Sequence, residues 1–245
     1  MGRRLVLVVI SIVAFAASAS SAGAWVMLGP GSAWRLRPAQ PQPHGRLVVR
    51  IRPGAVVTLR ARPFGRVLER VGSTTEFGSP RAFAVRASHN GRWLAVNDAP
   101  LGNGRVAWID ARAGGVRYRR TQLEIDVDLS ARMLMLRRGE TVLRRARVGI
   151  GQPGSATPTG RFAVTDELRG SAYSASYGCC ILALSATQPN LPSTWRNGNR
   201  IAIHGTPNTA DFGRAVSAGC VHAPDALLHY LMRVTPLGTP VVIRR

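Results

Sequence analysis

The sequence contains no lysine, because all 33 of its basic residues are arginine. Catalysis through a lysine Schiff base is therefore excluded. Acidic residues are also scarce: 12 Asp and Glu leave a formal net charge of +21. Arginine keeps its charge and its planar fork matches carboxylates and phosphates, so an acidic polymer is a natural partner. The alternative is a solvated basic surface encoded by a GC-rich genome.

Cysteine is rare as well, with three residues in the chain, Cys179, Cys180 and Cys220. An odd number cannot form a disulfide framework by itself, so at least one thiol is expected to be free, and we choose Cys220. Cys179 and Cys180 lie in an apolar run in which an extended backbone would point them to opposite faces. We expect both to be small buried hydrophobic side chains rather than a redox pair, since a bond between neighbours requires an unusual geometry.

No apolar run is long enough to cross a bilayer comfortably. The run from Leu5 to Ala17 follows Arg3 and Arg4 and is succeeded by small residues. This layout predicts a secretory signal over residues 1–24, with an uncleaved N-terminal anchor as the alternative and the only predicted link to a membrane. Export would place the chain in the cell envelope, in the periplasm or cell wall. Nucleic acid is scarce there, and the sequence has no basic-aromatic binding signature, so we expect no nucleic-acid partner.

Residues 25–45 are rich in proline and glycine and are predicted to be a linker. Residues 46–120 contain short β-type runs separated by turn signals such as Asn90-Gly91 and Asn103-Gly104, which predicts a small β-barrel. The six runs are Leu47–Ile51, Val56–Arg60, Arg66–Val71, Phe83–Val85, Trp93–Val96 and Val106–Ile109. The first 120 residues carry 19 Arg against 4 acids, whereas residues 121–245 carry 14 against 8. The N-terminal half, with the larger excess of positive charge, is therefore expected to bind an acidic polymer more strongly.

Residues 121–245 begin with strict alternation from Leu123 to Ser130, which is typical of a half-buried strand. Further strand patterns follow, and the chain closes with another. Pro224 and Asp225, followed by apolar residues at helical spacing, predict one short amphipathic helix after Cys220. Together these patterns predict a mainly β fold with a single short helix.

His204 ends the apolar run Ile201–Ile203, and Cys220 follows sixteen positions later, directly after Gly219. We interpret His204 as a base and Cys220 as a thiol nucleophile, because a thiol reacts as its thiolate. The following helix N-terminus is expected to lower the pKa of Cys220, and the N–H groups of Gly219 and Cys220 to face a developing oxyanion. A zinc site using His204, Cys220 and His222 is the competing interpretation, although it lacks a fourth ligand.

Six segments, in this order, resemble the L,D-transpeptidase (YkuD-domain) family of bacterial cell-wall enzymes. They are Ile-Asp-Val-Asp-Leu-Ser, Thr-Pro-Thr-Gly-Arg-Phe, the Tyr-Gly and Leu-Ser-Ala segments, Ile-His-Gly-Thr, Ser-x-Gly-Cys and Gly-Thr-Pro-Val-Val-Ile. The resemblance implies a β-sandwich or barrel catalytic domain over residues 121–245, with no metal or cofactor. It also implies that Cys220 is the nucleophile, that His204 is the base, and that the Gly205 carbonyl orients the imidazole. Ser217, Gly219 and His222 are assigned to substrate binding or orientation.

Residues 46–120 resemble a bacterial Src-homology-three-like cell-wall module in the segments around Trp93 and Trp108. Such modules often precede a catalytic domain, although both tryptophans could equally be core aromatic residues.

Two positions depart from the family pattern, which usually has His or Lys in place of Ala218 and Arg or Asn in place of His222. The implied reaction is attack of Cys220 on a tetrapeptide stem of peptidoglycan, release of D-alanine, and transfer of the acyl group to a diaminopimelate-type amine of a neighbouring stem. With water as acceptor the protein would be an L,D-carboxypeptidase. If the departures mark a decayed site, it would be a non-catalytic wall-binding protein. The partners expected are peptidoglycan stem peptides and anionic wall polymers.

Overall fold

The computed structural model describes residues 45–191 and 199–245. The predicted signal, residues 1–24, and the predicted linker up to residue 44 lie outside the described residues. Within the described part of the chain, no helix has both the length and the apolar character needed to cross a membrane.

Seven antiparallel strands occupy the first part of the described chain and form one sheet with the order β3-β2-β6-β5-β4-β1-β7. Six of the seven strands fall where β-type runs are predicted, and β7 is additional. Their bounds are β1 Arg46–Ile51, β2 Val57–Arg60, β3 Val67–Val71, β4 Ala82–His89, β5 Trp93–Val96, β6 Ala107–Asp110 and β7 Val116–Thr121.

The seven-stranded sheet encloses a core of its own. Buried side chains from all seven strands, including Val71 of the edge strand β3 and Val116 of the edge strand β7, belong to one cluster. Side chains from both edges can share a core only when the sheet curls, which gives this part of the chain its barrel-like form. Trp93 is 3% exposed and contacts Phe64 edge-to-face with ring centroids 4.9 Å apart.

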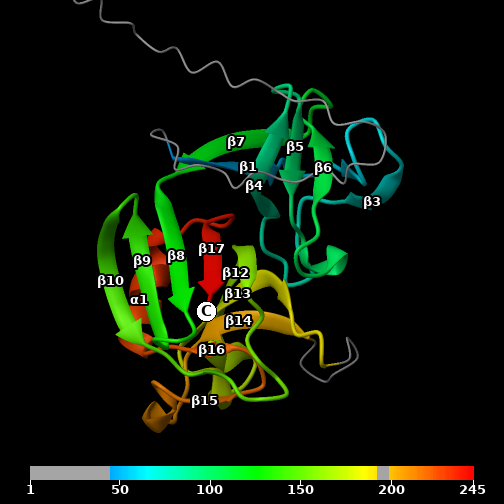
Figure 1. Cartoon of the computed structure of the whole chain (residues 1–245). Helices are drawn as coiled ribbons and strands as arrows, with labels where there is room; N and C mark the ends of the chain where they lie inside the picture. Colours follow the sequence, from blue (N-terminus) through cyan, green and yellow to red (C-terminus); the bar gives the residue numbers. More distant parts are fainter. Residues whose placement is uncertain (1–44, 192–198) are drawn as a thin grey trace, which may run out of the picture. The chain divides into compact units, whose positions relative to one another are not determined.

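The second sheet has eight strands in the order β10-β9-β8-β17-β12-β13-β14-β16. The last strand of the chain, β17, pairs in parallel with β8 and antiparallel with β12, and so lies between them (Figure 1). A separate pair, β11 and β15, is also parallel. The bounds are β8 Leu123–Asp128, β9 Met133–Arg138, β10 Thr141–Arg147, β11 Ile150–Gly151, β12 Gly160–Arg169, β13 Cys180–Thr187, β14 Arg200–His204, β15 Ala215–Ser217, β16 Val221–His222 and β17 Pro240–Arg244.

The α-helix of the described chain, α1, spans Asp225–Val234 after an N-cap at Pro224. The predicted position of the helix after Cys220 is therefore confirmed. It buries Leu227, Leu228 and Leu231 in the core of the second sheet, because residues three and four apart share one face. Short 3₁₀ turns occur at Ala99–Leu101, Gly170–Ala172, Ala175–Tyr177 and Thr209–Asp211.

Buried polar contacts join the two sheets. The Asn97 amide donates to Ser185 Oγ at 2.8 Å, and the Thr75 hydroxyl bonds the fully buried Asp166. Asn103 both donates to the Thr187 carbonyl at 2.6 Å and accepts from the Thr187 N–H at 2.9 Å. Since a buried polar group is costly unless it is paired, these contacts fix how the sheets meet.

Candidate active site

The parallel pair of strands β14 and β16 places the two predicted residues on one face. Ile203 is opposite Val221, and His204 is opposite His222. Successive side chains of a strand alternate between faces, so Ile203 and Val221 enter the core while the two histidines share the other face. Cys220, two positions before His222, lies on that same side. Its Sγ is 3.9 Å from the Arg200 carbonyl oxygen, and the backbone N–H of Ala202 also interacts with the thiol.

The ring of His204 is fixed on two sides. Its Nδ1 lies 2.6 Å from the Gly205 carbonyl oxygen, which can only accept, so Nδ1 carries the proton and Nε2 keeps a lone pair. Tyr177 packs edge-to-face on the ring, with centroids 4.8 Å apart. The resemblance implied this role for the Gly205 carbonyl, and the geometry is compatible with it.

Burial lowers the pKa of His204 to about 4; the hydrogen bond to Gly205 opposes the shift, nearby His222 adds to it, and Asp211 opposes it. His204 is 5% exposed. At neutral pH the imidazole is therefore uncharged and able to accept a proton.

The thiol of Cys220 has a raised pKa because it is enclosed by its neighbours, with a smaller opposing effect from the Ala202 N–H. The helix N-terminus was expected to lower this pKa if the geometry brought it to the thiol, whereas the pKa is raised. The first turn of α1 instead contacts the segment before β13, since the Asp225 carboxylate accepts the Cys179 N–H at 3.4 Å. The phenol of Tyr177 has a raised pKa from burial and from the charge that Cys220 would carry, and the two residues line the same cavity.

The turn before Cys220 is held by Ser217. Its hydroxyl donates to the Cys220 carbonyl at 2.6 Å and accepts the Gly219 N–H at 3.1 Å. The prediction that the Gly219 N–H faces an oxyanion is wrong in this arrangement, because that N–H is already bonded. Gly219 has φ of +123°, a conformation that favours glycine. Gln188 supports the turn by donating to the Ala218 carbonyl at 3.3 Å.

His222 has a partner that the sequence analysis missed. Its Nδ1 lies 2.7 Å from Asp211 Oδ2, and its ring is 4.8 Å from that of His204. Asp211 also accepts from the Thr206 hydroxyl at 3.1 Å and from the Asn208 amide at 2.9 Å. Asp211 is the one acidic residue in the sequence between Ile201 and His222. The presence of a single acidic residue between the His204 and Cys220 motifs was the signal that could have identified Asp211 as the partner of His222.

A cavity of about 500 Å³ opens at Cys220. Four of its lining residues come from loops of the N-terminal sheet, nine come from the segments around β12, β13 and β14, and Cys220 directly precedes β16. The lining residues are Glu76, Phe77, Ala99, Pro100, Leu168, Tyr173, Tyr177, Ile181, Ala183, Thr187, Asn199, Arg200, Ala202 and Cys220.

The prediction for the cysteines is confirmed for Cys220 and wrong for Cys179 and Cys180. Cys220 is free, as expected. Cys179 and Cys180 do not point apart as separate hydrophobic side chains, because a disulfide bond joins them. The strand begins only at Cys180, and Cys179 belongs to the preceding turn, so the alternation of an extended strand does not apply. His229, to which the sequence analysis gave no role, lies with its Nδ1 3.7 Å from Cys180 Sγ.

The zinc alternative gains no support from this geometry. The Nδ1 atoms of His204 and His222 are occupied by Gly205 and Asp211. Among the described residues, the three side chains whose ligand atoms meet within 4.8 Å are those of Cys179, Cys180 and His229, a different set.

This part of the chain is thus a mainly β domain that presents a histidine and a cysteine on one face. Residues 122–243 match the family model of the L,D-transpeptidase catalytic domain, YkuD. This part of the chain belongs to that family.

Three known proteins illustrate what this chain is similar to, one compared by sequence and two by structure. A Bacillus subtilis (strain 168) protein, provisionally named L,D-transpeptidase YkuD, is 30% identical over 121 residues, which are 49% of this chain and 65% of the relative. An L,D-transpeptidase from Mycobacterium smegmatis shares 13% identity over 66% of this chain and 93% of its own, with a TM-score of 0.40. A mutant L,D-transpeptidase from Enterococcus faecium shares 18% identity over 50% of each chain, with a TM-score of 0.40.

Proposed function

We propose that this protein is an exported L,D-transpeptidase of peptidoglycan that uses Cys220 as nucleophile and His204 as base. The observation that carries the proposal is an uncharged, oriented imidazole on the same face as a free thiol that lines a cavity. Membership of residues 122–243 in the family supports the reaction type. Export rests on the predicted signal, because peptidoglycan lies outside the cytosol.

The two pKa shifts constrain the first step. Burial raises the pKa of the Cys220 thiol and lowers that of His204, so in the resting protein the proton stays on sulfur. Transfer of that proton to His204 Nε2 therefore accompanies attack of Sγ on the carbonyl carbon of the stem peptide. The oxyanion that forms is assigned to the backbone N–H of Cys220, since Ser217 occupies that of Gly219.

The remaining steps return the proton. His204 gives it to the departing amine, D-alanine leaves, and a thioester joins the acyl group to Cys220. The amine of a neighbouring stem then attacks the thioester, His204 accepts a proton from it, and the thiol is restored as the crosslink forms.

The N-terminal module contributes to substrate binding in this proposal. Glu76 and Phe77 line the cavity, and Glu76 pairs with Arg200, which also lines it. A carboxylate and a guanidinium that line the same cavity as the thiol suit a stem peptide, which carries both amines and carboxylates.

Anionic wall polymers are the second partner that we propose. Four arginines, Arg119, Arg120, Arg138 and Arg233, line a second hollow together with Glu167. Guanidinium groups at this density favour phosphates and carboxylates.

Analysis of muropeptides after incubation with purified sacculi tests the proposal. Wild type should release D-alanine and add crosslinks, and Cys220→Ala should do neither; Ala226→Gln, an exposed change on α1, is the matched control. Remodelling by Cys220→Ala would refute the assignment of the nucleophile. Release of D-alanine without new crosslinks would identify water as the acceptor, and sedimentation of both proteins with unchanged sacculi would indicate a non-catalytic binder.

A further inference from the structure

The disulfide between Cys179 and Cys180 has one reachable and one protected sulfur. Cys180 is 5% exposed, whereas Cys179 is partly exposed in the turn before β13. A thiolate that attacks a disulfide must reach the sulfur along an open path. An incoming thiol can therefore approach Cys179, and Cys180 is the sulfur that would leave.

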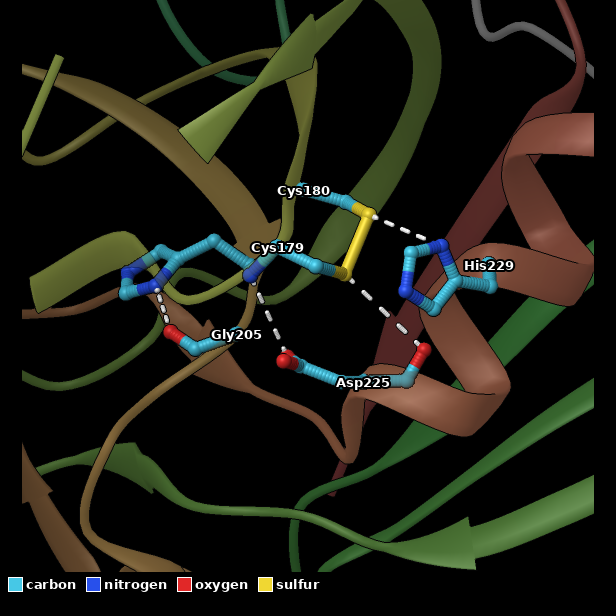
Figure 2. The surroundings of a disulfide bond; sticks show 6 residues. Cys179, Cys180, Gly205, Asp225 and His229 are labelled. Atoms are coloured by element: carbon cyan, nitrogen blue, oxygen red, sulfur yellow. Dashed lines mark hydrogen bonds between the residues drawn. A yellow bond between two sulfur atoms is a disulfide. The ribbon is translucent and has the colours of Figure 1, made fainter. Parts of the chain in front are cut away.

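The leaving sulfur faces an imidazole. His229 Nδ1 lies 3.7 Å from Cys180 Sγ, and His229 is exposed on α1, one helical turn after Asp225 (Figure 2). A neighbouring imidazolium stabilises a thiolate, and exchange is faster when the leaving thiolate is stabilised. The other side of the pair is also held by α1: Cys179 Sγ lies 3.9 Å from the Asp225 carbonyl oxygen, and the Asp225 side chain accepts the Cys179 N–H.

We propose that Cys179 and Cys180 form a redox-active site that exchanges with an external dithiol, with Cys179 as the attacked sulfur and His229 as the proton donor to Cys180. One thiolate of the dithiol bonds Cys179 Sγ while the Cys179–Cys180 bond breaks, and Cys180 takes a proton from His229. The second thiol of the partner then displaces Cys179, which leaves as a thiol. His229 then takes up, through water, the proton that the partner's first thiol released when it became a thiolate. The protein thus gains two electrons and two protons, and the partner becomes a disulfide.

The redox site adjoins the candidate base. The Gly205 N–H donates to the Cys180 carbonyl at 3.1 Å, and the Gly205 carbonyl orients His204. Gly178 packs so closely on Gly205 that a Cβ on Gly178 would meet the Gly205 Cα at 2.7 Å. Tyr177, at the start of the same segment, packs on the His204 ring. Two separate thiols occupy more room than a bonded pair, so opening the bond shifts this segment and misplaces His204. This coupling rests on the proposed function, whereas the exchange reaction does not.

Peptide mass mapping after graded dithiothreitol treatment and alkylation tests the exchange in the full chain carrying Cys220→Ala. We expect both thiols to appear, and His229→Gln to slow their appearance by about tenfold, which is less than the roughly hundredfold or more typical of acid–base catalysis because His229 is exposed. Ala226→Gln should match the parent protein. Resistance of the disulfide to millimolar dithiothreitol would overturn the site, and an unchanged rate in His229→Gln would overturn the role of His229.

Trapping the mixed disulfide tests which sulfur is attacked. After brief treatment of the Cys220→Ala protein with reduced glutathione and rapid alkylation, peptide mapping should find glutathione on Cys179 and the alkyl group on Cys180. The opposite assignment would refute attack at Cys179.

The rate of Cys220 alkylation by iodoacetamide tests the coupling without any peptidoglycan. Reduction of wild type should slow it by roughly tenfold through loss of the positioned base. The Cys179→Ser/Cys180→Ser protein should not respond to dithiothreitol. Equal rates before and after reduction of wild type would overturn the coupling. Failure of the muropeptide experiment, by contrast, would leave the exchange results standing.

Discussion

Replacement of Gly205 by alanine should destabilise the protein through backbone crowding. A Cβ at this position would meet the Asp225 carboxylate, the Gly178 Cα at 2.9 Å and the Tyr177 carbonyl oxygen at 3.0 Å. Two of these three atoms belong to the backbone and cannot turn aside as the end of a side chain can. Overpacking of this kind typically costs about 1–3 kcal/mol. The displaced segments are also those that hold the His204 ring.

Gly72→Ala is the matched control, because Gly72 has no positive φ and no atom lies within 4 Å of its ideal Cβ. Where alanine fits, the exchange stabilises by about 0.4–1 kcal/mol through the unfolded state. Urea denaturation should therefore separate the two variants by about 1.5–4 kcal/mol in the free energy of unfolding. Alkylation of Cys220 should slow in Gly205→Ala alone. Equal stability of the two variants would show that this packing is looser than the structure describes.

Three further predictions concern the side chains of His204, Glu167 and Asn103. The free energy of unfolding of wild type, measured relative to that of His204→Gln, should fall by up to about 3 kcal/mol from pH 6.5 to pH 4, because the buried His204, with its pKa lowered to about 4, stays neutral while the unfolded chain takes up a proton; a constant difference between the two proteins would contradict this. Burial raises the pKa of Glu167 to about 7, so its ionisation destabilises the folded state as pH rises from 4.5 through 7, and Glu167→Gln should stabilise the protein by about 1–3 kcal/mol at pH 8 but little at pH 4; equal effects at both pH values would refute it. Asn103→Ala should cost about 1–3 kcal/mol in urea denaturation by leaving the Thr187 backbone groups unpaired, whereas Asn103→Asp, which can still accept, should cost less.

Strand positions were predictable where burial alternates along the chain. The strand at Leu123–Asp128 has this pattern and was predicted within two residues. The strand at Val116–Thr121 was not predicted, because its four central residues, Arg117 to Arg120, are all exposed. It forms an edge by pairing with β1 alone, and an edge strand depends on backbone pairing that composition does not reveal.

Some features of the candidate site were likewise predictable from the sequence and others were not. His204, Gly205 and Cys220 could be identified because ordered motifs carry them. The contacts that set their properties come from distant segments: Gln188 supports the turn before Cys220, and Tyr177 packs on His204. Such contacts follow from how β13 and β14 pair and leave no local pattern in the sequence.

The disulfide shows why a local rule failed at one position. The expectation for Cys179 and Cys180 assumed a strand through both residues, whereas Gly178, with φ of +58°, turns the chain just before them. That turn brings Gly178 against Gly205 and leaves Cys179 outside β13. The geometry that pairs the two sulfurs is therefore the same geometry that positions the Gly205 carbonyl for His204. A change in the segment from Tyr177 to Cys180 should act on the thiol disulfide pair and on the candidate base together, and separating the two effects requires variants such as His229→Gln that leave the backbone in place.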